Sequence, residues 1–248
     1  MQSLVHYLMQ AERPVVAIAG NKSRLPLFTR RYAYLLGLWL AQEKVTLRIS
    51  PCRGFCAWFM KGWKSYGGPT PDLYLAFRKQ EGYTTSTYTR RESSDVAAAL
   101  HEGFHKLPGV SRLLASTHVE LVLGRDHCTP ADCLICFTQD AAQTHEEVDG
   151  RTGVGSFALL AASHCRDLGL PLHVFQVHDS ATVRETLAYL ATNHNRQIAG
   201  LARTLAAKLD EPRGMPTRCP GTQESKHGRR CIQPAPHNHA PALQAARP

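Results

Sequence analysis

The chain has 248 residues, of which 43% are hydrophobic, and it carries a formal net charge of +9 at pH 7. This length suffices for one α/β domain with a sizeable core plus appendages, and the composition is that of an ordinary globular protein. No apolar run approaches the ~20 residues that span a bilayer, and the N-terminal residues do not have the pattern of a secretory signal. We therefore predict a cytoplasmic protein with no membrane partner.

The predicted elements alternate between strands and helices along most of the chain, which is typical of an α/β fold. In chain order they are strand 15–19, helix 28–42, strand 45–49, helix 55–64, strand 72–77, helix 94–105, strand 119–123, strand 133–137, helix 156–163, strand 172–175 and a helical pattern over 187–209. Ser93 or Ser94 is the predicted N-cap of the third helix, 94–105. Residues 193–195 and Gly200 are expected to interrupt the last helical pattern. We predict a Rossmann-like three-layer fold with a mostly parallel sheet.

Basic charge is concentrated at the C-terminal end. Beyond Asp210, six lysines and arginines stand against two glutamates, a net +4, and large apolar residues are almost absent. Such a segment buries too little apolar surface to fold. We therefore predict a Rossmann-like domain over residues 1–210 and a basic, Pro/His-rich disordered tail over 211–248. Positive charge favours nucleic acids and nucleotides non-specifically, although a basic tail needs no such partner.

The segment from Asp132 to Phe175 carries the clearest functional pattern. An apolar run stops at the polar residues Thr138, Gln139 and Asp140, and the sequence GVGS then precedes an apolar helix and a second β-like run. This order describes a βαβ unit with a glycine turn at the start of its helix. Backbone N–H groups at such a turn, together with the helix dipole, favour an anionic ligand. A phosphate-bearing ligand at a parallel sheet is therefore the first hypothesis.

The eight cysteines include a CxxC at Cys133 and Cys136, with Cys128 nearby. The spacing fits zinc, but Cys133 to Phe137 has the composition of a buried strand. Two residues three apart on a strand point to opposite faces of the sheet, which is poor zinc geometry. Buried thiols that act as small apolar side chains are the alternative, and we predict no metal and no cofactor.

Four motifs in order resemble the SLOG superfamily of Rossmann-like proteins. They are VVAIAG followed by NKSR (Gly20, Arg24), ISPCRGFCAWF (Ser50, Arg53, Gly54), PADCLICFTQD (Thr138, Asp140) and TGVGSFA (Gly153, Gly155, Ser156). That superfamily groups DNA-processing recombination mediators with cytokinin-activating "Lonely guy" phosphoribohydrolases. This chain is most similar to short, phage- or plasmid-encoded members. The resemblance covers roughly residues 13 to 178 and implies nucleotide-related ligands, a role in mobile elements, and a tendency to form homo-oligomers.

The sequence also departs from that pattern. Pro51 and Cys52 replace a glycine pair in the second loop. The phosphoribohydrolases carry a glutamate shortly after the glycine turn, where this chain has SFALLAAS without a carboxylate. Glu146 and Glu147, in the preceding loop, are the nearby carboxylates. Cleavage of an N-glycosidic bond needs a placed acid or stabilising charge, so no catalytic residue is assigned.

The candidate ligand-binding residues are expected at the carboxyl ends of the strands, where open α/β sheets bind ligands. They are Gly20, Arg24, Ser50, Arg53, Gly54, Thr138, Asp140, Gly153, Gly155 and Ser156. Each also has a plain structural interpretation, since glycines form turns, Thr138 and Asp140 can cap a loop, and arginines are often simply solvated.

Three functions remain open at the level of sequence. The first is binding of a nucleotide or nucleotide-derived metabolite, including NAD derivatives, by a sensor or sequestering protein. The second is a DNA-binding recombination accessory protein that contacts single-stranded DNA. The third is a nucleotide N-glycoside hydrolase, which the missing glutamate disfavours.

Overall fold

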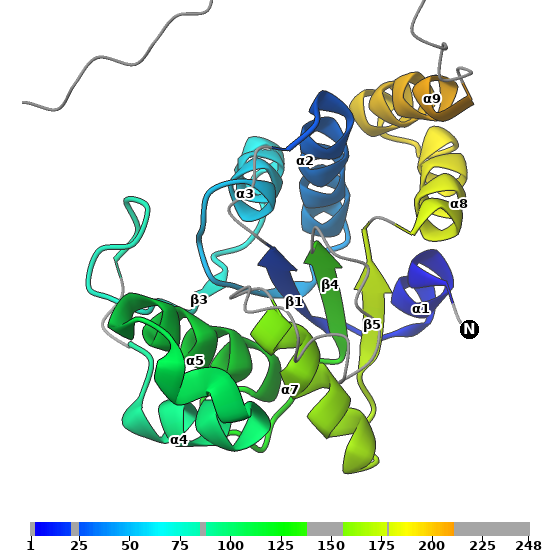
Figure 1. The fold of residues 1–248 in the computed structure, drawn as a ribbon. Coiled ribbons are helices and arrows are strands. Elements are labelled where there is room, and N and C mark those ends of the chain that lie inside the picture. Colours follow the sequence, from blue (N-terminus) through cyan, green and yellow to red (C-terminus); the bar gives the residue numbers. More distant parts are fainter. Residues whose placement is uncertain (1–2, 21–24, 85–87, 138–155, 178, 211–248) are drawn as a thin grey trace, which may run out of the picture. The chain divides into compact units, whose positions relative to one another are not determined.

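The chain forms a five-stranded parallel sheet in a computed structural model that describes residues 3–20, 25–84, 88–137, 156–177 and 179–210 (Figure 1). The strands are β1 Val15–Gly20, β2 Thr46–Ile49, β3 Asp72–Leu73, β4 Cys133–Phe137 and β5 His173–Gln176. Their order across the sheet is β3-β2-β1-β4-β5, and every neighbouring pair is parallel. The predicted α/β class and its parallel sheet are confirmed.

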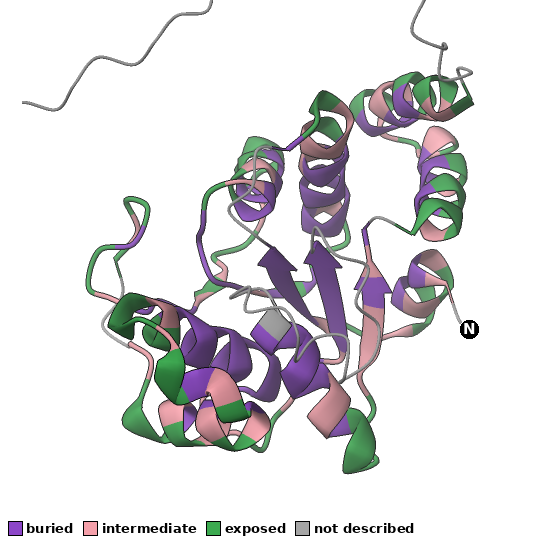
Figure 2. Cartoon of the chain, viewed as in Figure 1, coloured by how far each residue is buried: buried purple, intermediate pink, exposed green. Residues whose placement is uncertain are grey.

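Helices cover both faces of the sheet and complete the three layers. They are α1 Leu4–Gln10, α2 Leu27–Gln42, α3 Phe55–Tyr66, α4 Arg91–Leu100, α5 Gly109–Leu123, α7 Ser156–Asp167, α8 Ser180–Ala191 and α9 Arg196–Asp210, with a short 3₁₀ helix, η1, at Glu102–Lys106. One apolar core joins α1, α2, α3, α8 and α9 to the face of the sheet that carries Ile18 and Ile135. The other joins α4, α5 and α7 to the face that carries Ala17 and Leu134. The central strands are accordingly buried on both sides (Figure 2).

The handedness of the crossovers explains which helix lies on which face. The connections β1–α2–β2 and β2–α3–β3 step toward one edge of the sheet, and their helices share one core. The connections through α4 and α5 to β4, and through α7 to β5, step in the other direction, and their helices share the opposite core. Parallel crossovers of a single hand require this arrangement. The reversal of direction lies between β1 and β4.

The prediction of a strand at residues 119–123 is wrong. These residues form the last turn and a half of α5, and the ten consecutive residues from Leu114 to Leu123 are all buried. The helix packs against α4, α7 and β1, so no face of this stretch is exposed to solvent. A short apolar run rich in valine and leucine has no helical periodicity when it is buried on every side, and a strand and a buried helix then look alike.

Other boundaries differ for local reasons. Ser93 and Ser94 do not cap a helix, because α4 begins at Arg91 and their hydroxyls bond to His127 and Ser116 instead. The strand expected at 72–77 is reduced to Asp72–Leu73. The break predicted at 193–195 is confirmed, whereas Gly200 lies inside α9. Helix α1, which Ser3 caps, was not predicted.

The two cysteines of the CxxC lie on opposite faces of β4, as the alternation of a strand predicts. Cys133 belongs to one core and Cys136 to the other. Both are fully buried, and burial raises the pKa of the Cys136 thiol to about 12. The thiols therefore serve as small apolar side chains. Within the described part of the chain, no three His, Cys, Asp or Glu residues are grouped so that they would hold a metal ion.

The backbones of α2 and α3 lie in direct contact. A Cβ atom on Gly37 would overlap the carbonyl oxygen of Phe59, and one on Gly62 would overlap that of Tyr34. Each glycine thus lies against the backbone of the facing helix, where no side chain fits. Gly200 on α9 differs, because a Cβ there would meet nothing within 4 Å.

Substitution at this contact should separate packing from helix propensity. We expect Gly37→Ala and Gly62→Ala to lower the free energy of unfolding by about 1–3 kcal/mol each, because they overpack a closed contact. Gly200→Ala should raise it by up to about 1 kcal/mol, because alanine favours the helix and has space. Urea unfolding followed by circular dichroism measures all three. A stability gain in Gly37→Ala or Gly62→Ala would contradict the close approach of the two backbones.

Candidate functional site at the carboxyl edge of the sheet

The strand order reverses at β1 and β4, whose last residues, Gly20 and Phe137, are partners in the parallel register. The chain leaves β1 toward α2 on one face and leaves β4 toward α7 on the other. In open α/β sheets, ligands bind outside the carboxyl ends of the strands at such a reversal. The fold therefore puts the candidate site here.

Aromatic side chains pack together at this edge of the sheet. Phe55, the first residue of α3, stacks on Phe137 with ring centroids 5.6 Å apart. A Cβ atom on Gly20 would lie 3.0 Å from the Cβ of Phe55, so a larger residue at the end of β1 would require the start of α3 to shift slightly. The thiol of Cys52 donates to the carbonyl of Gly20 over 3.5 Å. Gly20 thus has a packing role in addition to the predicted ligand contact.

Two helix N-termini lie at this edge, since α2 follows β1 and α3 follows β2. The residues before them, Pro26 and Gly54, are the N-caps, and neither makes a side-chain capping hydrogen bond. Gly54 has φ of 87° and ψ of −127°, a conformation that essentially only glycine adopts. The N-terminal ends of helices carry partial positive charge and attract anions.

The residues predicted after β2 have different environments. Ser50 is buried, and its hydroxyl accepts a hydrogen bond from the Gln80 side-chain amide over 3.1 Å. The side-chain oxygen of Gln80 in turn accepts a hydrogen bond from the backbone N–H of Ala76. Arg53 has an 81% exposed side chain and an ion pair with Glu81 at 3.2 Å. Ser50 therefore anchors the 76–80 segment to the sheet, while Arg53 faces solvent with a weakly held partner.

The structure thus brings together Gly20, Ser50, Arg53 and Gly54 at the carboxyl ends of two neighbouring strands. Ser156 begins α7, the helix that follows β4. The remaining predicted residues lie outside the described residues. They are Arg24, Thr138, Asp140, Gly153 and Gly155.

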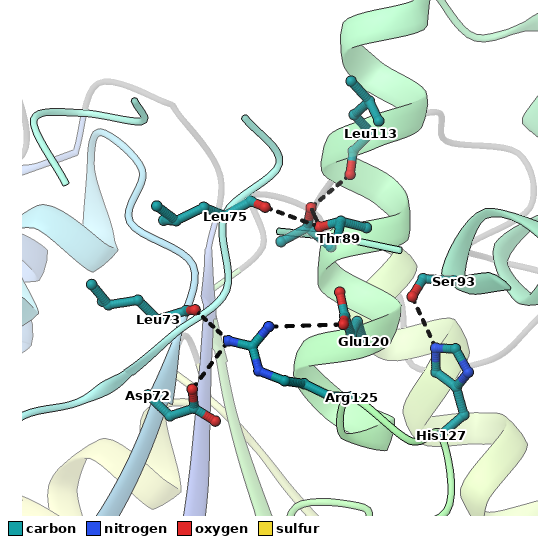
Figure 3. A network of polar contacts seen from close by, with 10 residues as sticks. Asp72, Leu73, Leu75, Thr89, Ser93, Leu113, Glu120, Arg125 and His127 are labelled. Carbon is teal, nitrogen blue, oxygen red and sulfur yellow. Dashed lines mark hydrogen bonds and ion pairs between the residues drawn. The ribbon is translucent and has the colours of Figure 1, made fainter. Parts of the chain in front are cut away.

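A second polar cluster, which the sequence did not reveal, ties α5 to β3 (Figure 3). The guanidinium of Arg125 donates to the carbonyl of Leu73 over 2.7 Å, pairs with Asp72 at 3.2 Å and lies 4.4 Å from the ring centroid of Tyr74. Its other terminal nitrogen is 3.9 Å from the fully buried carboxylate of Glu120. Burial raises the pKa of Glu120, while Arg125 opposes the rise. We interpret this cluster as an anchor for the short edge strand β3.

Comparisons of the chain with models of protein families, with curated proteins and with solved structures find no match. Among the described residues, no helix is both long and apolar enough to cross a membrane.

The raised pKa of Glu120 has a consequence for stability against pH. The native state holds the proton of the Glu120 carboxyl more tightly than the unfolded chain does. This difference stabilises the native state fully below pH 4.5, the ordinary pKa of the group. The stabilisation is lost as pH rises through the raised pKa of the native state. We expect Glu120→Gln and the wild type to have similar free energies of unfolding near pH 4. As pH rises, the variant should become the more stable of the two, and the difference should reach a constant value by pH 8.

Urea unfolding at several pH values tests this expectation. Glu92→Gln, at an exposed position on α4, is the matched control and should give a difference that does not follow this pH dependence. A Glu120→Gln protein that is less stable than the wild type at pH 8 would show that the ion pair with Arg125 outweighs desolvation.

Proposed function

We propose that the protein binds a nucleotide or nucleotide-derived metabolite at the carboxyl edge of its sheet, as a sensor or sequestering protein. The observation that carries the proposal is the reversal of strand order at the Gly20–Phe137 pair. The loops that follow both strands begin side by side there. A ligand in this position contacts the ends of β1 and β4 and the helices that cover opposite faces.

The charge distribution at this edge suits the phosphate of such a ligand. The N-terminal ends of α2 and α3 both point their partial positive charge to it, and their N-cap residues, Pro26 and Gly54, make no side-chain capping hydrogen bond. Arg53 adds a solvent-exposed positive charge beside Gly54. The predicted residues Arg24, Gly153 and Gly155 belong to the loops after β1 and β4, so they would supply the remaining contacts to phosphate.

The same edge offers less for catalysis. Helix α7 begins with SFALLAAS, which has no carboxylate where the resembling hydrolases carry one. The buried carboxylate of Glu120 is held by Arg125 at β3, on the side of β2 away from the strand pair. Among the described residues, the carboxylate nearest Gly54 that we identify is that of Glu81, which is paired with Arg53 and so is not free to act as the acid in N-glycoside cleavage. Binding without turnover therefore fits the described residues better.

A ligand screen tests the proposal directly. Thermal shift of the full chain would be measured against nucleoside mono- and diphosphates, NAD-derived metabolites and short single-stranded DNA. We expect a small nucleotide to stabilise the wild type, and Arg24→Ala and Gly155→Asp to weaken its binding at least about tenfold, because each removes or opposes a charged contact with phosphate. Arg166→Ala, at the far end of α7 where the chain leads into β5, is the matched control and should bind like the wild type.

The DNA-binding alternative has its own signature in the same screen. If single-stranded DNA alone stabilises the protein, and if that effect falls steeply with salt and disappears on removal of residues 211–248, the basic tail is the binding element. The nucleotide proposal would then be wrong. It would also be wrong if a nucleotide bound equally well to the wild type and to both loop variants.

A further inference from the structure

A cavity of about 550 Å³ lies away from the carboxyl edge, between the ends of four helices. Its wall includes Met9, Gln42, Glu43, Tyr66, Tyr189 and the segment 192–194. Only three residues separate Gln42, the end of α2, from the start of β2, so the cavity adjoins the amino end of that strand. Its volume is in the range of small-molecule sites.

The helices that line this cavity all present their C-terminal ends to it. Helix α2 ends at Gln42, α3 ends at Tyr66, and α8 ends at Ala191 just before the lining segment. The C-terminal end of a helix carries partial negative charge, which favours a cation within the last turn. Three such ends converge here, from helices of 16, 12 and 12 residues.

A carboxylate adds a full negative charge to these partial ones. Glu43 lines the cavity, and its Oε1 accepts hydrogen bonds from the indole N–H of Trp39 over 3.1 Å and from Gln42 over 3.4 Å. These donors orient the carboxylate without neutralising it. No lysine or arginine is among the described residues that line the cavity. Arg203 donates to the Ala191 carbonyl over 3.4 Å but does not line the cavity.

Beside the polar residues Gln42, Thr192, Asn193 and His194, the wall carries two tyrosines and a methionine, which select among cations. The hydroxyl of Tyr189 donates to the Met9 sulfur over 3.0 Å, and its ring lies 5.9 Å from that of Trp39. Burial and the nearby charge of Glu43 raise the pKa of Tyr189, consistent with a negative potential at this wall. Tyr66 is 39% and Met9 is 58% exposed, an uncommon exposure for such side chains. Aromatic faces attract organic cations, whereas a small metal ion prefers several oxygen ligands.

We propose that this cavity binds a small organic cation with a substituted ammonium group, held by Glu43, the Tyr66 and Tyr189 rings and the negative ends of α2, α3 and α8. The wall matches each part of such a ligand. The carboxylate and helix ends stabilise its charge, and the aromatic and thioether groups cover its methyl or methylene groups. This site is independent of the proposed nucleotide site.

Choline and the uncharged alcohol in which carbon replaces its quaternary nitrogen form a matched pair of probes. They would be titrated into the full chain with isotope-labelled methionine methyl groups, and the Met9 signal would be assigned by its loss in Met9→Leu. We expect choline to shift the Met9 signal saturably, and the uncharged alcohol to bind at least about tenfold more weakly, since it lacks the charge that the site recognises.

Two variants and a control complete the test. Glu43→Gln keeps an acceptor for Trp39 and should weaken choline binding at least about tenfold, without the same effect on the uncharged alcohol. Tyr66→Leu, at the exposed rim, should also weaken choline binding and serves if Glu43→Gln fails to fold. Glu92→Gln on α4 should leave the affinity unchanged. Equal binding of the charged and uncharged probes, an unmoved Met9 signal, or full affinity in a folded Glu43→Gln or Tyr66→Leu protein would overturn the proposal.

Discussion

The parallel pairing of β1 with β4 is the constraint on which the rest of the structure depends. Residues 16–20 of β1 and all of β4 are buried, so each strand must present apolar side chains to both faces. The two faces are not equivalent. Small residues, Ala17 and Ala19, face α5 and α7, while Val16 and Ile18 face the larger core with α2 and α3. Because all crossovers have the same hand, the chain leaves the two strands toward opposite faces of the sheet. The proposed nucleotide site lies at this point of the carboxyl edge.

The position of α3 at that edge also depends on a contact between two helices farther along their length. Gly37 and Gly62 let the backbones of α2 and α3 touch, which fixes how α3 lies on the sheet. The first residue of α3, Phe55, then reaches the end of β1, where a Cβ atom on Gly20 would lie only 3.0 Å from the Cβ of Phe55. Gly20, a candidate phosphate contact in the sequence, therefore also lets the positive end of α3 pack closely against the end of β1.

The sequence predicted those elements whose signals are local. The strands at 15–19 and 133–137 are apolar runs closed by glycine or polar residues, and helices 28–42 and 55–64 differ from the structure by no more than two residues at either end. Contacts between distant segments were not predictable in this way. Gln80 reaches Ser50 across 30 residues, and Arg125 reaches Leu73 across 52. The burial of Glu120 was not predicted, because the sequence around it was interpreted as a strand. On a strand, its side chain would have been expected to face solvent.

The two proposed sites use opposite ends of the same two helices. Helices α2 and α3 direct their N-terminal ends to the carboxyl edge and their C-terminal ends to the cation cavity. At a rise of about 1.5 Å per residue, α2 separates the two ends by roughly 24 Å, about three Debye lengths at physiological salt. Direct attraction between a bound anion and a bound cation is therefore weak. Coupling would require α2 and α3 to slide against each other, and the glycine contact between their backbones opposes that motion. The same contact that positions both sites should thus keep them energetically separate.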